Sequence, residues 1–491
     1  MDALANVPLP RTSPESQGLC SQAVLDFLDD IAQQELELHS LMILRNGNVI
    51  AEGWWSPYAP HLNHSLYSLS KSFTATAIGM AVDEGLLSID DRVIDYFPEK
   101  LPAHLDERWR SLTIKHLLTM TTGHSEDPTN EVLSTPHGDW VRAFFACPLE
   151  KEPGSIFVYN TAATYMLSAI LQKITGEKLI DYLRPRLFQP LGIANPTWWE
   201  CPQGISTGGF GLNITTEDIA KFGLLFLNKG KWNGAQLVSA EWVEQASSPQ
   251  VSNFVDDPAS DWQQGYGYQM WMCRHGAYRG DGAFGQYCVV MPEQQAVIAI
   301  TAGIGEMQPV LTSLWEHILP QFGEVLPEDP ELHQRLKERL ENLSLPMLPG
   351  VWNEAAAAQI SGKCYEMEPN DLGLTSLEFA AEDREIRITA YLEGAPIQLR
   401  GGFGSYIPQD VATKGSGEAI AWRLGGQGPC LICATWEDDQ KLVVLSRFVE
   451  TPFSRTAILK FAGDELTLEL SQNCSFGPTE HPPIKGRLRR S

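Results

Sequence analysis

A serine and a lysine lie three residues apart, Ser68 and Lys71, at the start of a predicted helix. The apolar residues that follow recur at helical spacing up to a glycine stop: Leu69, Phe73, Ala77, Met80 and Gly85. Residues three apart share one face of a helix. A partly desolvated lysine can take the proton of a serine hydroxyl, and the helix N-terminus suits a developing oxyanion. The alternative is an ordinary helix start capped by serine, since about one chance match to Ser-x-x-Lys is expected in a chain of this length.

Two further segments carry side chains that could join this chemistry. Tyr159, Asn160 and Thr161 open a second helix, whose apolar stripe runs from Ala163 to Ile174. A tyrosine held beside a lysine can have a lowered pKa and act as a general base. Gly280–Tyr287 is a glycine-rich entry to a strand, where a backbone can approach a ligand closely. Taken alone, these segments also fit a core tyrosine and a flexible turn.

The order and context of these segments resemble the serine β-lactamase-fold family, which includes class C β-lactamases, D-Ala-D-Ala peptidases and β-lactamase-like esterases. The resemblance extends to about residue 325 and is carried by four blocks in the family's order: Tyr67–Thr74, Pro153–Tyr159, Gly211–Gly223 and Gly282–Pro292. It implies a sheet flanked by helices and a helical region, with the active site between them.

The resemblance also implies roles for particular residues. Ser68 would be the nucleophile, Lys71 its partner and Tyr159 the motif tyrosine. The substrate-binding set would be Asn160, Thr161, Gly282 and Ala283, with an oxyanion hole formed by the backbone N–H of Ser68 and one near Ala283. The function that follows is a serine hydrolase that cleaves a small ester or amide through a Ser68 acyl-enzyme. The alternatives are a D-amino-acid peptidase or weak β-lactamase, and a catalytically silent binding or regulatory protein on the same scaffold.

Two departures from the family pattern bear on the substrate. The second motif, Tyr-x-Asn in the family, has Thr161 at its third position. The third motif, Lys-Thr-Gly or His-x-Gly in the family, is Gly280-Asp281-Gly282, or Tyr278-Arg279-Gly280 if the register slips. Asp281 would repel a substrate carboxylate. These departures argue against recognition of β-lactams and leave acyl transfer intact.

Other candidate sites in the sequence are weaker. Gly204–Gly208 spells Gly-x-Ser-x-Gly around Ser206, but it lacks the strand before and the helix after that a nucleophile elbow needs. His61 and His64 have no acidic partner motif, so we expect loop histidines, no metal and no cofactor. Cys430 and Cys433 form the one CxxC pair, which we interpret as two buried thiols in a strand.

The pattern of predicted elements gives an α/β (α+β) fold. Ser40–Arg45 and Val49–Trp54 predict a hairpin around Asn46-Gly47, and Gly285–Met291 and Ala296–Thr301 predict two later strands. Helices lie between them, including one that starts at Thr215 with Asp218 as its capping-box partner. We expect one antiparallel sheet flanked by helices with an inserted helical region, which is β-lactamase/transpeptidase-like.

The C-terminal third has a different pattern. We predict residues 1–325 as the hydrolase domain, 326–359 as a proline-rich linker and 360–491 as an antiparallel β domain. Short strands separated by turn residues favour an all-β meander or barrel. They are Leu377–Ala380, Ile386–Tyr391, Ile397–Leu399, Ile420–Leu424, Leu431–Trp436, Leu442–Phe448, Thr456–Phe461 and Leu466–Leu470.

Composition limits the partners. The 491 residues carry a formal net charge of -25, which argues against nucleic acid and anionic membranes. The N-terminal residues show no signal-peptide pattern, no apolar run has the length of a membrane span, and nine scattered cysteines suit a reducing compartment. We therefore expect a cytoplasmic protein whose partner is a small-molecule ester or amide. The oligomeric state stays open, a homo-oligomer included.

Overall fold

The computed structural model describes residues 8–392, 395–411 and 428–489. Contacts divide the chain into two compact units. The first contains the chain up to Trp54, Asn63–Ala302 and Glu306–Asn342, and the second contains Trp55–Leu62, Gly303–Gly305 and Leu343–Ser491. The predicted linker holds two helices, of which α12 (Pro330–Glu341) belongs to the first unit and α13 (Glu354–Ile360) to the second.

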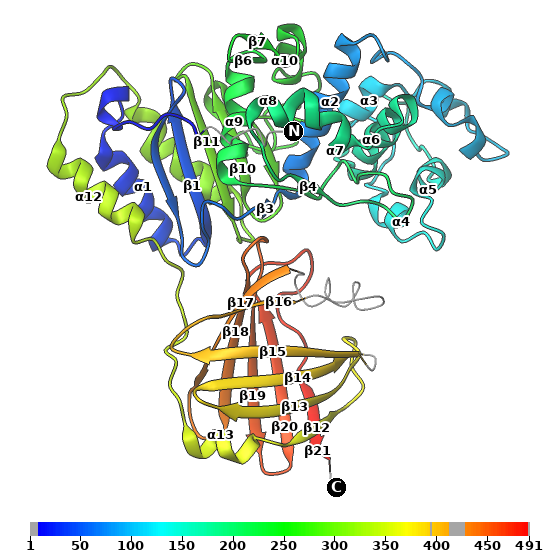
Figure 1. Ribbon diagram of the computed structural model, residues 1–491. Helices are drawn as coiled ribbons and strands as arrows, with labels where there is room; N and C mark the ends of the chain where they lie inside the picture. The colour runs from blue at the N-terminus through cyan, green and yellow to red at the C-terminus, as the bar shows by residue number, and fades with distance from the viewer. Residues whose placement is uncertain (1–7, 393–394, 412–427, 490–491) are drawn as a thin grey trace. The chain divides into compact units, whose positions relative to one another are not determined.

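The first unit is built on a six-stranded sheet in the order β2-β1-β11-β10-β9-β8 (Figure 1). Neighbouring strands in this sheet are antiparallel. The bounds are β1 (Leu38–Arg45), β2 (Asn48–Trp54), β8 (Trp271–Met272), β9 (Tyr278–Gly282), β10 (Gln286–Met291) and β11 (Ala296–Ala302). The predicted hairpin is confirmed, because Asn46 and Gly47 both take the positive φ that a tight turn needs, 49° and 78°.

Helices cover this sheet. On one side lie α1 (Ser21–Gln33), α12, α11 (Gln308–Ser313) and the π-helical turn Leu314–Ile318, and on the other lies α9 (Thr216–Leu227) (Figure 1). The predicted capping box of α9 is present, with Thr215 Oγ1 accepting from the Asp218 N–H at 3.3 Å and the Asp218 carboxylate accepting from the Thr215 N–H at 3.2 Å. The residues of α9 that face the sheet are buried.

The helical region inserted between β2 and β8 contains α2 (Ser70–Asp83) and α6 (Thr161–Thr175), which pack against each other. Its other helices are α3 (Ile114–Leu118), α4 (Thr129–Leu133), α5 (Trp140–Ala146), α7 (Leu179–Leu183), α8 (Gln189–Leu191) and α10 (Ala240–Ala246). Short strands form a three-stranded and a two-stranded sheet beside them: β3 (His64–Ser65), β4 (Thr197–Trp198) and β5 (Leu212–Ile214), then β6 (Lys231–Trp232) and β7 (Ala235–Gln236). The inserted helical region is therefore confirmed.

The second unit is a closed barrel. Its strands run in the order β15-β14-β13-β12-β21-β20-β19-β18-β17, and a parallel pairing of β15 with β17 closes the ring, while β16 continues from β17. The bounds are β12 (Cys364–Met367), β13 (Leu374–Glu382), β14 (Glu385–Leu392), β15 (Ala395–Phe403), β16 (Ile407–Val411), β17 (Gly428–Trp436), β18 (Lys441–Phe448), β19 (Ser454–Ala462), β20 (Glu465–Gln472) and β21 (Ile484–Leu488). The predicted strand Ile420–Leu424 lies outside the described residues.

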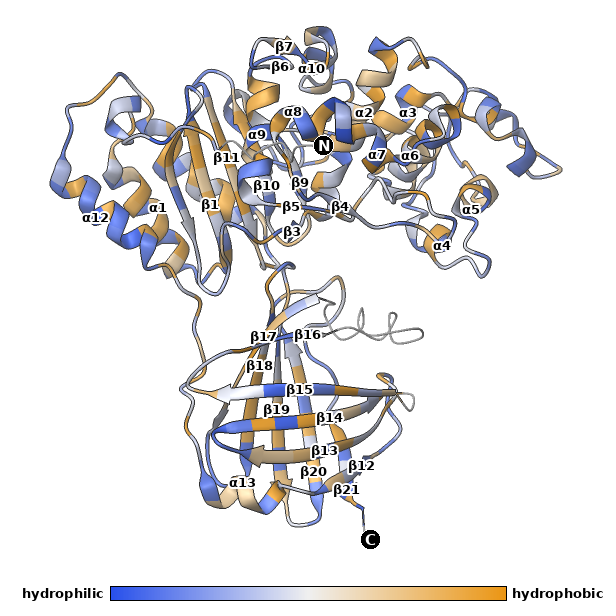
Figure 2. Ribbon diagram, viewed as in Figure 1, coloured by the Kyte–Doolittle hydropathy of each residue, from blue (hydrophilic) through white to orange (hydrophobic). Residues whose placement is uncertain are grey.

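Polar and apolar residues alternate along the barrel strands, as Figure 2 shows on β14. This period of two places one set of side chains inside the ring. The inward residues form a hydrophobic core of their own, apart from the core of the first unit. Of the two structures that the strand spacing favoured, the barrel is the one that forms.

Candidate active site

Ser68 lies where a short 3-10 turn, Tyr67–Leu69, leads into α2. Tyr67 before it has a φ of 48°, in the left-handed region that non-glycine residues seldom occupy. Backbone strain of this kind is common where a fold positions a reactive side chain. Ser68 is half-buried and lies two residues before the first residue of α2, at the N-terminal end of this helix.

The start of α2 is fixed by polar side chains that bond outside the helix. Ser70 Oγ accepts the backbone N–H of Leu212 at 3.0 Å, and Thr74 Oγ1 donates to the carbonyl of Gly208 at 2.8 Å. Both side chains are fully buried. A buried hydroxyl without a partner would be costly, so these bonds hold the helix in one orientation.

Lys71 is 1% exposed, and its ammonium group has three hydrogen-bond partners. Nζ donates to Ser68 Oγ at 3.0 Å, to Thr161 Oγ1 at 3.0 Å and to the carbonyl oxygen of Gly209 at 2.7 Å. Nζ also lies 4.9 Å from the centre of the Tyr159 ring. The structure thus brings Ser68, Lys71, Tyr159 and Thr161 together.

Burial lowers the pKa of Lys71 to about 7, and the carboxylates of Asp127 and Asp281 limit this fall. Burial has the opposite effect on Tyr159: its pKa is raised, and Asp281 adds to the rise while a hydrogen bond with Ser68 opposes it. The prediction that the pKa of Tyr159 is lowered is therefore wrong. Near neutral pH, Lys71 can accept a proton and Tyr159 is a neutral phenol.

The Asn160 side chain has a structural role. Its Oδ1 accepts the backbone N–H of Ala163 at 2.9 Å as the N-cap of α6, and its Nδ2 donates to Thr122 Oγ1 at 3.1 Å. The side chain is fully buried. We therefore assign Asn160 to the support of α6 and keep Thr161, whose hydroxyl contacts Lys71 directly, as the candidate that faces the site.

The third motif lies on β9 beside the turn that holds Ser68. Gly280 and Gly282 face this turn, and a Cβ atom at either position would overlap Leu69 or the carbonyl oxygen of Leu66. At Gly282 the overlapping atom belongs to the backbone, so glycine is required there for the close approach of β9. Ala283 follows directly and is half-buried, so its N–H remains the candidate for a second oxyanion donor.

Between these glycines, Asp281 forms a buried ion pair with Arg279. Arg279 Nε donates to Asp281 Oδ2 at 2.9 Å, and Arg279 Nη2 lies 2.8 Å from the same oxygen. The Asp281 side chain is 6% exposed and the Arg279 side chain is 0% exposed. The guanidinium also lies over the rings of Trp262 and Trp271, at 4.4 and 5.9 Å from their centres. Burial raises the pKa of Asp281, and Arg279 opposes that rise.

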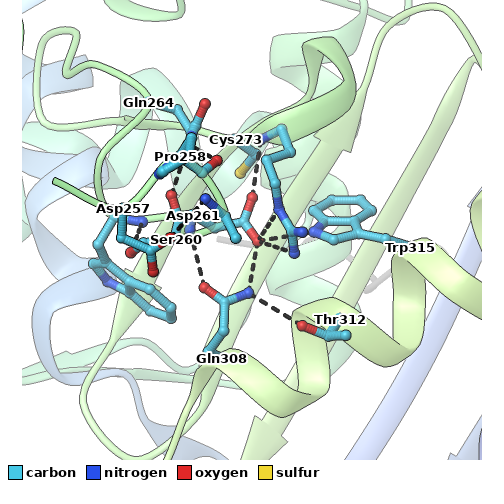
Figure 3. Close-up of polar contacts among 12 residues, drawn as sticks. Asp257, Pro258, Ser260, Asp261, Gln264, Cys273, Gln308, Thr312 and Trp315 are labelled. Atoms are coloured by element: carbon cyan, nitrogen blue, oxygen red, sulfur yellow. Dashed lines mark hydrogen bonds and ion pairs between the residues drawn. The ribbon is translucent and has the colours of Figure 1, made fainter. Parts of the chain in front are cut away.

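A second acidic residue, Asp261, holds Arg279 through its backbone oxygen, which accepts from Nη1 at 2.8 Å. The Asp261 carboxylate accepts from Gln308 Nε2 at 2.7 Å and from Trp315 Nε1 at 2.9 Å (Figure 3). The Arg274 guanidinium lies 3.0 Å from the same carboxylate. These bonds outweigh the effect of burial, and the pKa of Asp261 is lowered. The network fixes the strand that carries Asp281.

Sequence reasoning missed two neighbours of the site, the carbonyl of Gly209 and the ring of Trp271, and it named Arg279 only in the alternative register of the third motif. Trp271 stacks on Tyr159, with 5.2 Å between ring centres and 24° between planes. The pairing of Arg279 with Asp281 could have been predicted, because residues two apart on a strand face the same side of the sheet. A backbone carbonyl such as that of Gly209 leaves no signal in a sequence.

Burial explains why the weaker candidates stay outside the site. Ser206 is 0% exposed. Its segment contributes two backbone acceptors instead: the carbonyl of Gly208 accepts from Thr74, and that of Gly209 accepts from Lys71. Cys430 and Cys433 are both 1% exposed and form no disulfide, as interpreted from the sequence. His64 lies in the short strand β3 rather than in a loop, with its Nε2 at 2.9 Å from Nδ1 of His39.

A family model described as Beta-lactamase matches residues 28–318, which is more than half of the chain. The chain belongs to the beta-lactamase family. The matched region contains all the site residues described above and the strands of the six-stranded sheet.

Two curated relatives match over similar lengths. The chain is 26% identical over 300 residues to the 6-aminohexanoate-dimer hydrolase of Paenarthrobacter ureafaciens, a match that covers 56% of this chain and 76% of the relative. It is 28% identical over 307 residues to penicillin-binding protein 4 of Amycolatopsis lactamdurans, covering 53% and 77%.

Solved structures agree on the fold. A Bacillus anthracis protein, provisionally assigned as a 6-aminohexanoate-dimer hydrolase, aligns with a TM-score of 0.51 at 19% identity, over 68% of this chain and 88% of that one. A provisionally assigned beta-lactamase from Bacteroides dorei aligns with the same TM-score at 17% identity, over 60% and 98%. The β-lactamase fold expected from the sequence is thereby confirmed.

Proposed function

We propose that this beta-lactamase family protein is a serine hydrolase that cleaves small esters or amides through an acyl-enzyme on Ser68. The observation that carries the proposal is the 3.0 Å hydrogen bond between Lys71 Nζ and Ser68 Oγ, made by a lysine whose pKa burial lowers to about 7. A neutral amine at this distance can accept the hydroxyl proton as the oxygen attacks.

The steps of the reaction follow from the positions of these groups. Neutral Lys71 takes the proton of Ser68, whose Oγ bonds to the substrate carbonyl carbon. The backbone N–H groups of Ser68 and Ala283 stabilise the oxyanion. The leaving alkoxide or amine then takes a proton from the Lys71 ammonium, directly or through the Tyr159 hydroxyl. Water, deprotonated by Lys71, hydrolyses the acyl-enzyme and frees Ser68.

Two observations favour simple esters or amides as substrates. An aromatic cluster surrounds Tyr159, formed by Phe157, Trp262, Tyr266 and Trp271, and it suits an acyl or aryl group. The relative from Paenarthrobacter ureafaciens is named as a hydrolase of the 6-aminohexanoate dimer.

We also propose a cytoplasmic location, because the nine cysteines are all free thiols in the structure. In the described part of the chain, no helix combines the length and apolar character that crossing a bilayer requires.

A fluorophosphonate probe tests the proposed reaction. The probe should label Ser68, identified by peptide mass spectrometry, and Ser68→Ala should remove labelling and lower aryl-ester hydrolysis by about a thousandfold or more. Ser206→Ala is the matched control, since it removes the hydroxyl of a fully buried serine. Labelling of another serine, or no labelling of a folded protein, would reject the proposal and favour the silent binding protein.

A further inference from the structure

Trp271 on β8 connects the second and third motifs of the site. Its ring stacks on Tyr159, which belongs to the second motif. Across the sheet it pairs with Arg279 on β9, the strand of the third motif. Side chains of directly opposite residues lie on one face of a sheet, and so do those of residues two apart on one strand. Trp271, Arg279 and Asp281 therefore share one face, beside Tyr159.

The indole N–H of Trp271 forms a hydrogen bond with the Asp281 carboxylate. Trp271 is 8% exposed, and a buried indole N–H generally requires an acceptor. Asp281 is in turn held by Arg279, 2.8 Å from the guanidinium Nη2. The carboxylate is thus fixed on one side and fixes the indole on the other.

Two further aromatic rings pack on Trp271. The ring centre of Tyr266 lies 4.8 Å from that of Trp271, with 81° between the planes. The ring centre of Phe157 lies 6.0 Å away, with 69° between the planes. Packing and the N–H bond together hold the indole in one position, so Trp271 offers Tyr159 a rigid surface.

Tyr159 depends on such a surface. Its hydroxyl hydrogen-bonds with Ser68, but its side chain is only half-buried. A phenol ring can turn about two side-chain bonds, and a small displacement of a reacting group lowers the rate strongly. Stacking on a fixed indole restricts this rotation and keeps the hydroxyl near Ser68.

We propose that Trp271 is a positioning residue for Tyr159: it holds the phenol ring so that the hydroxyl stays on Ser68, and Asp281 fixes the indole through its N–H. The inference rests on the function proposed above, in which Tyr159 relays a proton to the leaving group. It also gives Asp281 a task inside the protein, as the acceptor for Trp271.

The test compares two esters whose leaving groups differ in their need for a proton. The p-nitrophenolate of p-nitrophenyl butyrate leaves without a proton, whereas the ethoxide of ethyl butyrate needs one. Trp271→Leu removes the stacked ring. It should lower kcat/KM about tenfold to a hundredfold for ethyl butyrate and about threefold at most for p-nitrophenyl butyrate. Trp271→Phe keeps a smaller ring and should show a weaker loss of the same kind.

Trp242→Phe is the matched control for this pair of variants. It shortens another tryptophan of the first unit that is 4% exposed, on α10. A loss of packing alone lowers the amount of active protein and affects both esters equally. Trp242→Phe should therefore leave the ratio of the two kcat/KM values at its native value.

Two measurements separate positioning from direct contact with the substrate. In a Tyr159→Phe background, Trp271→Leu should not change the ester ratio further, because its effect acts through the hydroxyl. In protein labelled with ¹⁵N-tryptophan, the indole N–H resonance of Trp271 is identified by its loss in Trp271→Phe. This resonance should shift in Asp281→Asn, where an amide oxygen replaces the carboxylate.

If Trp271→Leu does not fold by circular dichroism, Trp271→Phe and the indole resonance decide. A native ester ratio in the folded Trp271 variants, a further change of the ratio in the Tyr159→Phe background, or an indole resonance that Asp281→Asn leaves in place would overturn the proposal. Failure of the proposed function gives a different result: Ser68→Ala keeps its activity, or the fluorophosphonate probe labels another serine.

Discussion

Arg279 and Asp281 form a buried ion pair, with 2.8 Å between Nη2 and the carboxylate, on the strand where the family's third motif lies. The sequence predicted that Asp281 would repel a substrate carboxylate. In the structure the guanidinium neutralises that charge at close range, which weakens the repulsion. The two residues are best understood as one unit that shapes this side of the site.

Arg279→Met should destabilise the protein by about 3–5 kcal/mol, because it leaves a buried carboxylate without its partner. The pKa of Asp281, already raised by burial, should then rise further above its unfolded value of 3.8. Folded protein would bind the proton more readily than unfolded protein, so the stability loss should be smaller at pH 5 than at pH 8. Urea unfolding at both pH values measures this. Adding Asp281→Asn should recover part of the loss, and an equal loss at both pH values would contradict the prediction.

Short-chain aryl esters should be hydrolysed far better than β-lactams. In the Gly280-Asp281-Gly282 register the family's motif lysine is missing, and a Cβ atom on Gly280 would overlap the side chains of Leu69 and Ser72. The kcat/KM values for p-nitrophenyl butyrate and a chromogenic cephalosporin should differ by several powers of ten. Gly280→Lys should reduce ester hydrolysis and should not create β-lactamase activity. Efficient cephalosporin turnover by the native protein would refute this prediction.

Ester hydrolysis should rise with pH through an apparent pKa near 7, where Lys71 loses its proton. Asp127 is exposed, and its carboxylate raises the pKa of Lys71 against the larger effect of burial. Asp127→Asn should therefore shift the kcat/KM profile to lower pH. Glu126→Gln, which removes a charge from the exposed neighbouring position, is the control and should leave the profile in place. The pH profiles of the three proteins decide, and an unchanged midpoint in Asp127→Asn would argue against Lys71 as the base.

The contrast between predicted and missed features has a physical basis. Ser68, Lys71 and Thr161 lie at helix starts, whose signals are local: an apolar repeat for α2 and the Asn160 cap for α6. The carbonyl of Gly209 reaches Lys71 across 138 residues of sequence, so no local pattern reports it. The direction of the Tyr159 pKa depends on burial, which only the packed structure determines.

In the barrel too, local sequence patterns predict the strands but not the contacts between distant segments. Short runs bounded by turn residues predicted strands such as Ile386–Tyr391 and Leu442–Phe448, which agree with β14 and β18. Closure depends on the parallel pairing of Gly402 and Phe403 with Cys433 and Ala434, and a two-residue contact of this kind has no periodic signal.

Lys71 and Tyr159 should act as one unit in catalysis, because Lys71 Nζ lies 4.9 Å from the Tyr159 ring centre and both groups hydrogen-bond to Ser68. Tyr159→Phe removes the hydroxyl and keeps the ring that stacks on Trp271. Lys71→Met should lower kcat/KM by about a thousandfold or more. The double variant that combines Lys71→Met with Tyr159→Phe should have a kcat/KM within about tenfold of that of Lys71→Met alone, since the effects of residues that share one proton transfer are non-additive.

Thr161 provides the control for this coupling. Thr161→Ser keeps the hydroxyl that accepts from Lys71 and should keep most of the activity, whereas Thr161→Ala should reduce it. Combined with Lys71→Met, Thr161→Ala should have no further effect, because its contribution acts through the ammonium group. Stopped-flow measurement of acylation for the whole set separates proton transfer from substrate binding. Effects of Lys71→Met and Tyr159→Phe that multiply in the double variant would show that the two residues do not share the proton transfer.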